Sequence, residues 1–228
     1  LRRYQILTTP LPFQSSEHLI SALFSIIAWT WPIGSEEKTK DRKVLASSTE
    51  RSTPELHQAF RLLNAGYFFQ GFGYIIIGTY LVVLADPVFG SSAAAITWAV
   101  AGVAAIPSPY FWSALAERFG RRRALLGCYT LQVAGAIAAT FGNSTVLLMV
   151  AAILFGATFM GITMLTISTG VAYRINGGAA RLTTWYSLGQ VVGPAAIGVL
   201  LSNSIRISFI IATIAIIIGM ATIKVSRL

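Results

Sequence analysis

Four polar side chains interrupt one long apolar stretch of the sequence: Asn64, Tyr67, Gln70 and Tyr74. The stretch, 62–85, runs for 24 residues without an ionisable acid or base, which is enough to cross a hydrocarbon layer about 30 Å thick. At about 100° per residue the four side chains fall on one arc, with Gln70 at its edge. Amide and phenol groups at membrane depth need neighbouring helices or water as partners. We interpret the stretch as the first helix of a transporter bundle.

The composition is that of a membrane protein. Of 228 residues, 55% are hydrophobic and 11% are charged, and the mean hydropathy is +0.69, whereas soluble domains average about 25% charged residues. The net charge of +9 would suit nucleic acid. However, the basic residues lie in short segments between apolar runs, as cytoplasmic loops do. We therefore expect no nucleic-acid partner and a multi-pass protein in the lipid bilayer of the plasma or inner membrane.

The sequence lacks the patterns of catalysis and cofactor binding. It has no G-x4-G-K-[ST] phosphate loop, which argues against ATP-driven chemistry. His18 and His57 have no second His or Cys at metal-ligand spacing, and Cys128 has no partner for a disulfide. We expect no metal, no cofactor and no enzymatic activity.

The chain divides into three parts, 1–33, 34–61 and 62–228. In the first, Leu19–Ile33 is an apolar run of 15 residues, shorter than a span of about 20. It is a remnant of a transmembrane helix, an interfacial segment or a signal-peptide core. The second, rich in Ser, Thr and Lys, reads as a flexible linker, in which Pro54 could open a helix that runs into the first span.

The third part predicts an all-α bundle with six transmembrane spans. Pro107 and Pro109 should kink or break the second span near its cytoplasmic end. The expected spans are Leu62–Ala85, Ala93–Ala116, Ala124–Phe141, Val146–Tyr173, Leu182–Leu201 and Ile207–Ile223.

Basic residues are distributed unevenly over the connections between these spans. The linker holds six, segment 117–123 four, segment 174–181 two and the C-terminus two, which makes 14, whereas the other connections hold only Arg206. Because Lys and Arg accumulate in cytoplasmic loops, we expect the linker and the C-terminus to face the cytoplasm.

The connection after the second span carries the most specific motif. It reads SALAERFGRRRAL from Ser113 to Leu125 and resembles the G-x-L-a-D-r-f-G-r-r-r-x-L loop of the major facilitator superfamily. Ser113 replaces the usual Gly, and Glu117 replaces the usual Asp. The resemblance implies a cytoplasmic gating loop, although an ordinary positive-inside loop would also carry these bases. The residues of this gating loop are Glu117, Arg118, Gly120, Arg121 and Arg122.

Three further stretches are similar to the YbfB/YjiJ-type branch of that superfamily. They are GFGYIIIGTYL at 71–81, GATFMGITML at 156–165 and LGQVVGP at 188–194. The resemblance covers 62–223 and implies helices seven to twelve of a twelve-helix transporter, which form two inverted three-helix repeats. Residues 1–61 would then be the end of helix six and the central loop. The expected partner is a missing N-terminal half or a second copy of the chain.

The resemblance also implies that the seventh and tenth helices, here Leu62–Ala85 and Val146–Tyr173, line a substrate cavity. On the tenth, Phe159, Thr163 and Thr166 share one arc. The alternative is that Thr hydroxyls bond back to their own helix and that tyrosines pack between helices. The expected cavity residues are Asn64, Tyr67, Gln70, Tyr74, Phe159, Thr163 and Thr166.

Small residues in the fifth span predict close helix packing. Gly189 and Gly193 are four residues apart, and Pro194 follows directly.

The family resemblance as a whole implies secondary active transport of a small solute by alternating access. The alternative is a truncated membrane module that has an assembly or regulatory role and transports nothing itself.

Overall fold

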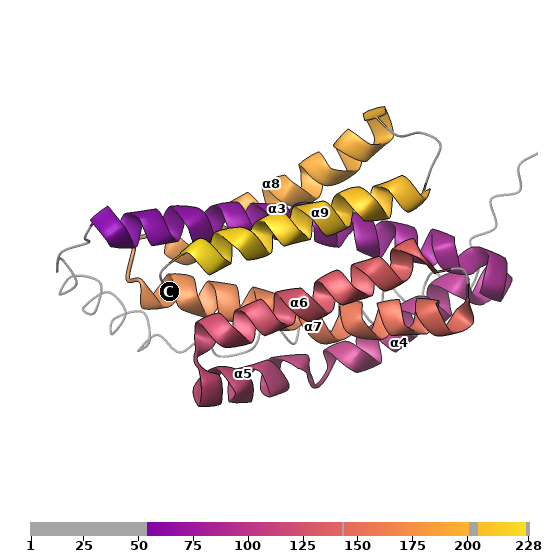
Figure 1. The fold of residues 1–228 in the computed structure, drawn as a ribbon, viewed down its shortest axis with the longest axis horizontal. Coiled ribbons are helices and arrows are strands. Elements are labelled where there is room, and N and C mark those ends of the chain that lie inside the picture. The colour runs from indigo at the N-terminus through magenta and orange to yellow at the C-terminus, as the bar shows by residue number, and fades with distance from the viewer. Residues whose placement is uncertain (1–53, 143, 201–204, 227–228) are drawn as a thin grey trace, which may run out of the picture. The chain divides into compact units, whose positions relative to one another are not determined.

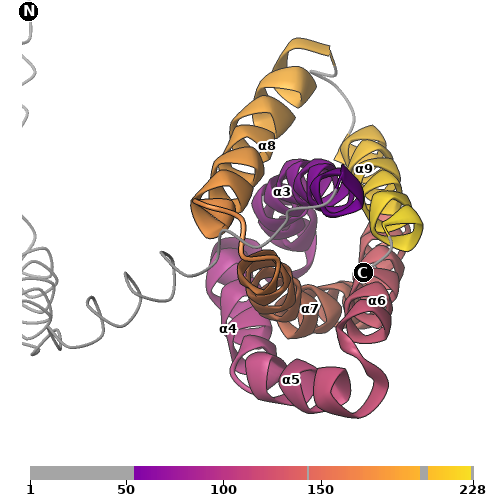
Figure 2. The ribbon, with the colours of Figure 1, turned by 90° about the vertical axis from the view of Figure 1, so that its left-hand side faces the viewer.

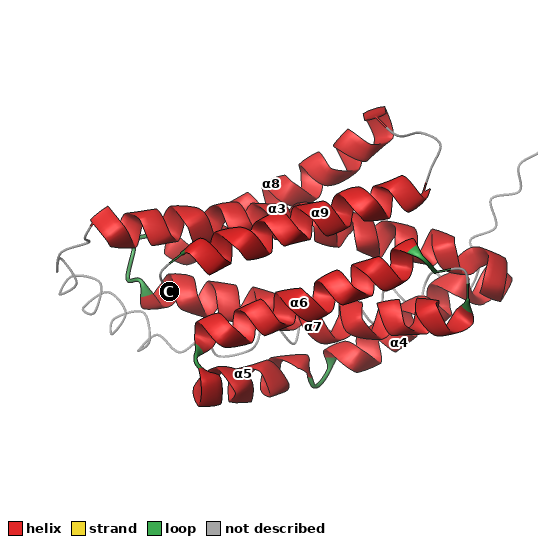
Figure 3. Cartoon of the chain, in the orientation of Figure 1, coloured by secondary structure: helices red, strands yellow, loops and turns green. Residues whose placement is uncertain are grey.

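The computed structural model describes residues 54–142, 144–200 and 205–226, and every regular element in them is a helix (Figure 3). Segment 1–33 and residues 34–53 of the expected linker lie outside the described residues. The three interpretations of Leu19–Ile33 therefore stay open.

The first described helix, α3, runs from Pro54 to Phe89. It begins eight residues before the expected first span at Leu62, so 54–61 are helical rather than part of a flexible linker. Two features favour this start: Pro54 has a φ suited to a first helical turn, and Glu55 places a carboxylate near the positive end of the helix dipole. The helix ends before Gly90, whose φ of +56° opens the short 3-10 helix η1, Gly90–Ser92.

The expected second span is two helices, α4 (Ala93–Ala105) and α5 (Ser108–Phe119). The break lies at Ile106 and Pro107, as the prolines predict, because proline has no N–H to donate to the preceding turn. The start of α5 is fixed to α7: Ser108 Oγ and Trp112 Nε1 both donate to the carbonyl of Ala157 at 2.7 Å.

Four helices complete the described chain: α6 (Arg121–Thr140), α7 (Thr145–Ala172), α8 (Gly178–Leu200) and α9 (Ile205–Val225). Ser144 caps α7, because its Oγ accepts from the Leu147 N–H at 3.3 Å. Among the described residues, three helical stretches are long and apolar enough to cross a membrane: 54–119, 145–172 and 205–225.

Helix α3 is central to the packing. It lies against α8 on one side and α9 on the other (Figure 2), while α6 packs on α7 and α9, and α4 packs on α7. The core is filled by large buried side chains from several helices. The largest of those that are almost completely buried are Phe60, Tyr67, Tyr129, Phe155 and Phe209.

The helices alternate in direction, except that α5 continues in the direction of α4 (Figure 1). The start of α3, the α5–α6 junction, the α7–α8 connection and the end of α9 all lie at one end of the bundle (Figure 1). We call this the basic end, because it carries most of the described Lys and Arg: Arg118, Arg121, Arg122, Arg123, Arg174, Arg181 and Lys224. The opposite end carries Arg206 at the start of α9.

Candidate functional site

Five aromatic side chains from α3, α7 and α8 meet in the interior of the bundle. We call them the aromatic wall: Tyr67, Tyr74, Phe155, Phe159 and Tyr186. Tyr67 stacks on Tyr186 with ring centroids 4.5 Å apart. Tyr74 stacks on Phe155 at 5.2 Å and lies 5.4 Å from Phe159. The pair of Tyr74 and Tyr186, 6.0 Å apart, joins the two groups, so helices far apart in sequence share one aromatic surface.

The wall contains three residues that the sequence predicted for the cavity, Tyr67, Tyr74 and Phe159. Sequence reasoning missed the other two. Phe155 could have been found, because it lies four residues before Phe159 and so shares its helix face. Tyr186 carried no such signal, since α8 showed only packing residues.

Threonines of α7 add hydroxyl groups near this wall. Thr163 Oγ1 donates to the Phe159 carbonyl at 3.0 Å, and its side chain is also hydrogen-bonded to Tyr67. The first contact is the back-bonding that the alternative reading expects. Thr166 is fully buried, and its Oγ1 has no hydrogen-bond partner among the described residues. Ring faces and hydroxyls suit a neutral or apolar solute, because stacking and single hydrogen bonds need no charge.

Asn64 and Gln70 lie apart from the aromatic wall, although all four polar residues of α3 were expected on one cavity face. Asn64 is 5% exposed, and its Nδ2 donates to the Phe60 carbonyl of its own helix at 2.7 Å. Gln70 is 1% exposed, and its Nε2 donates to Gln132 Oε1 on α6 at 2.8 Å. The edge position of Gln70 on the arc explains the difference: it turns toward α6 rather than toward α7.

The Gln70–Gln132 pair is a buried interhelical link. Both residues are 1% exposed. One hydrogen bond joins them, while Gln70 Oε1 and Gln132 Nε2 have no partner among the described residues. Tyr129, one turn before Gln132 on α6, donates its hydroxyl to the Gly66 carbonyl at 3.3 Å. Polar contacts thus fix α6 to α3 at two levels.

The predicted gating loop forms the sharp turn between α5 and α6. Gly120 is its only residue outside a helix and has φ of +88°, a conformation that strains residues with a Cβ. Arg122 Nη2 donates to the Lys224 carbonyl in the last turn of α9, where a cation also meets the negative end of the helix dipole. Glu117 and Arg118 are exposed, and the Arg118 guanidinium lies 5.3 Å from the centre of the Phe119 ring.

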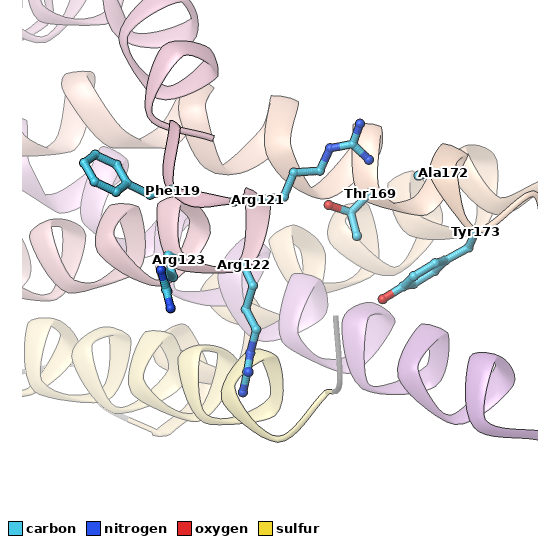
Figure 4. Close-up of a pocket in the computed structure, with 8 residues that line it drawn as sticks. Phe119, Arg121, Arg122, Arg123, Thr169, Ala172 and Tyr173 are labelled. Atoms are coloured by element: carbon cyan, nitrogen blue, oxygen red, sulfur yellow. The ribbon is translucent and has the colours of Figure 1, made fainter. Parts of the chain in front are cut away.

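A cavity of about 390 Å³ lies beside this turn (Figure 4). Its walls are the α5–α6 junction on one side and the last turn of α7 on the other. The lining residues are Phe119, Gly120, Arg121, Arg122, Arg123, Thr169, Ala172 and Tyr173.

Glycines allow α3 and α8 to approach closely beside the aromatic wall. A methyl group on Gly189 would lie 2.1 Å from the Phe68 carbonyl oxygen, and one on Gly193 would lie 2.8 Å from that of Phe72. From the other helix, a methyl on Gly71 would lie 2.2 Å from the Tyr186 carbonyl oxygen. Gly71 and Gly189 thus permit a distance between the backbones of α3 and α8 at which no larger residue would fit. We call this close contact between the two helices the α3–α8 seam. Pro194 lies inside α8, directly after Gly193.

Metal ligands do not gather in the part of the chain that the structure describes: no group of three His, Cys, Asp or Glu side chains there could hold an ion. The sites described above therefore offer aromatic, hydroxyl, amide and guanidinium groups.

Comparison with known families supports a membrane transporter. Residues 14–224 match the model of the family described as "Uncharacterised MFS-type transporter YbfB". The comparison with curated proteins gives no match. The match covers most of the chain, and it agrees with the apolar helices of 54–119, 145–172 and 205–225. The chain is an integral membrane protein and belongs to the YbfB-type family of major facilitator superfamily transporters.

Proposed function

We propose that this chain is the C-terminal half of a secondary active transporter and moves a small solute by alternating access. The observation that carries the proposal is the aromatic wall on α3, α7 and α8, in a chain that belongs to a transporter family. The solute would bind against the wall through stacking and through hydrogen bonds to the tyrosine hydroxyls. Because the aromatic wall lies beside the α3–α8 seam, movement of α8 would open or close the space in which the solute binds.

The proposal includes six membrane crossings. They are α3, α4 with α5, α6, α7, α8 and α9. The alternating directions of these helices support this count, because each consecutive crossing ends on the opposite side (Figure 1). The basic end would face the cytoplasm, since it holds seven of the nine described Lys and Arg residues.

A second six-helix body would complete the pathway. Helix α8 supports this, because its outer face is exposed and mixes polar with apolar side chains, which bare lipid would not favour. Ser187 is exposed there, one turn before Val191, which is 70% exposed. We propose that an N-terminal half, or a second copy of this chain, covers this face.

Flux measurements test the proposal. Proteoliposomes would hold either the chain alone or the chain with the first six helices of a full-length YbfB-type transporter, and exchange of labelled neutral and aromatic solutes would be followed. We expect exchange only when both bodies are present. Tyr186→Ala should abolish it, because it removes the ring that joins two stacks, whereas Tyr186→Phe should retain it.

The competing function is that of a truncated module with an assembly or regulatory role. It predicts no exchange with any supplied half, although both bodies insert and associate. That result would exclude transport as the function of this chain.

A further inference from the structure

The cavity at the basic end is lined by more positive than negative charge among the described residues. Three of its eight lining residues are arginines, and none of the Asp and Glu residues that the structure describes lines it. The closest acid in the sequence, Glu117, is exposed and lies on α5 outside the lining. A cavity with arginines on one wall and no carboxylate attracts anions.

Two of the residues that line this cavity carry a buried donor without a partner. The Arg122 Nε and the Tyr173 hydroxyl are both buried, and neither has a hydrogen-bond partner among the described residues. Buried donors are normally paired, because leaving one unpaired costs about 1–3 kcal/mol. The hydroxyl hydrogen of Thr169 is not available to a ligand, because it is already donated to the Leu165 carbonyl at 2.7 Å.

The donors come from two helices whose ends line the same cavity. Figure 4 shows Arg121 extending from the start of α6 toward Thr169, while Tyr173 extends from the end of α7 toward the side on which Arg122 lies. Arg122 is held in place by its bond to the Lys224 carbonyl, which leaves its Nε for another acceptor. The first amide N–H groups of α6 add partial positive charge at the same edge.

We propose that this cavity binds a phosphate-type anion. Guanidinium groups match the geometry of phosphate oxygens and bind them in a bidentate manner, and Tyr173 would donate to a further oxygen. The volume of about 390 Å³ exceeds that of a phosphate group and leaves room for a substituent. The anion can come from two sources, the headgroup of an acidic phospholipid or a free phosphate compound.

The bound anion would connect three helices. It bridges the start of α6 and the end of α7, and Arg122 extends the connection to α9. Occupancy would therefore stabilise the packed arrangement at the basic end. This inference concerns binding at the bundle end and is independent of transport.

The test uses residues 1–228 purified in a neutral detergent. The unfolding temperature is followed while sodium phosphate is added, against sodium chloride at the same ionic strength. We expect phosphate to raise the unfolding temperature of the wild type. Arg121→Gln should weaken the apparent phosphate affinity by at least about tenfold, and Tyr173→Phe by about threefold, as expected for the loss of a charged and of a neutral hydrogen bond. Arg118→Gln is the matched control, because Arg118 is exposed and does not line the cavity.

A second arm identifies the source. The same variants are incorporated into nanodiscs of phosphatidylcholine mixed with phosphatidylglycerol, extracted, and examined by native mass spectrometry for retained lipid. Preferential retention of phosphatidylglycerol that Arg121→Gln abolishes and Arg118→Gln preserves assigns a lipid headgroup. A phosphate-dependent shift without preferential lipid retention assigns a free phosphate compound. The proposal is overturned if Arg118→Gln and Arg121→Gln reduce binding equally. It is also overturned if phosphate acts only as chloride does while Arg121→Gln leaves lipid retention unchanged.

Discussion

The close approach of α3 and α8 gives the sharpest prediction about stability. In Gly189→Ala the new methyl would lie 2.1 Å from the Phe68 carbonyl oxygen and 2.8 Å from the Phe72 nitrogen. Ordinary contact begins at about 3.4 Å, so the two helices would have to separate by about 1.3 Å. Both neighbours are backbone atoms, and no side-chain rotation can relieve the overlap.

The expected cost follows from two opposing effects. Overpacking of this kind costs about 1–3 kcal/mol, while replacing Gly by Ala inside a helix gains about 1 kcal/mol. Gly198→Ala on the same helix isolates the second effect, because no atom lies within 4 Å of its added methyl. We therefore expect Gly189→Ala to be about 1–3 kcal/mol less stable than Gly198→Ala.

The assay is unfolding of residues 1–228 in mixed micelles with an increasing fraction of sodium dodecyl sulfate, followed by circular dichroism. Gly71→Ala provides a check from the opposite helix, since its methyl would lie 2.2 Å from the Tyr186 carbonyl oxygen. Equal free energies of unfolding for Gly189→Ala and Gly198→Ala would refute the close seam.

Three further predictions concern other parts of the bundle. Gln70→Leu and Gln132→Leu should each cost about 1–3 kcal/mol in micelle unfolding, and the double variant less than their sum, because each single change leaves one buried amide unpaired; strict additivity would show that the pair is not coupled. Thr166→Val should leave stability unchanged or raise it slightly in the same assay, since the buried Oγ1 has no partner among the described residues; a loss above about 1 kcal/mol would reveal a partner. A Cys at Glu117 should react with an impermeant thiol reagent only from the cytoplasmic side, and labelling from outside would reverse the proposed orientation.

Much of the helical architecture could be predicted from the sequence, since it depends on local properties. Uninterrupted apolar runs located α7 and α9 to within a few residues. Two prolines predicted the division between α4 and α5, because the missing N–H acts at the position where proline stands. The start of α3 at Pro54 agrees with the expectation that this proline could open a helix, although residues 54–61 are polar and were grouped with the linker.

The partners of side chains could not be predicted, because they depend on which helices become neighbours. The arc of α3 grouped Gln70 with Tyr67, but the structure directs Gln70 to Gln132 on α6 and Tyr67 to Tyr186 on α8. A lone amide in an apolar span such as α6 was the one available sign that Gln132 needed a partner. The link from Arg122 to the Lys224 carbonyl joins residues that lie 102 positions apart, and nothing in the sequence indicated it.

The central claim is that this chain is one half of a secondary transporter and needs a second body for coupled transport. Between residues 62 and 223 the only acids are Asp86 and Glu117, both near helix ends, and there is no His. Proton coupling needs a group that changes its charge inside the pathway, and arginine does not release a proton at biological pH. The most direct test applies a pH gradient to liposomes that contain residues 1–228 alone and measures accumulation of candidate solutes. We predict no accumulation above the outside concentration, whereas gradient-driven accumulation that an ionophore abolishes would contradict the claim.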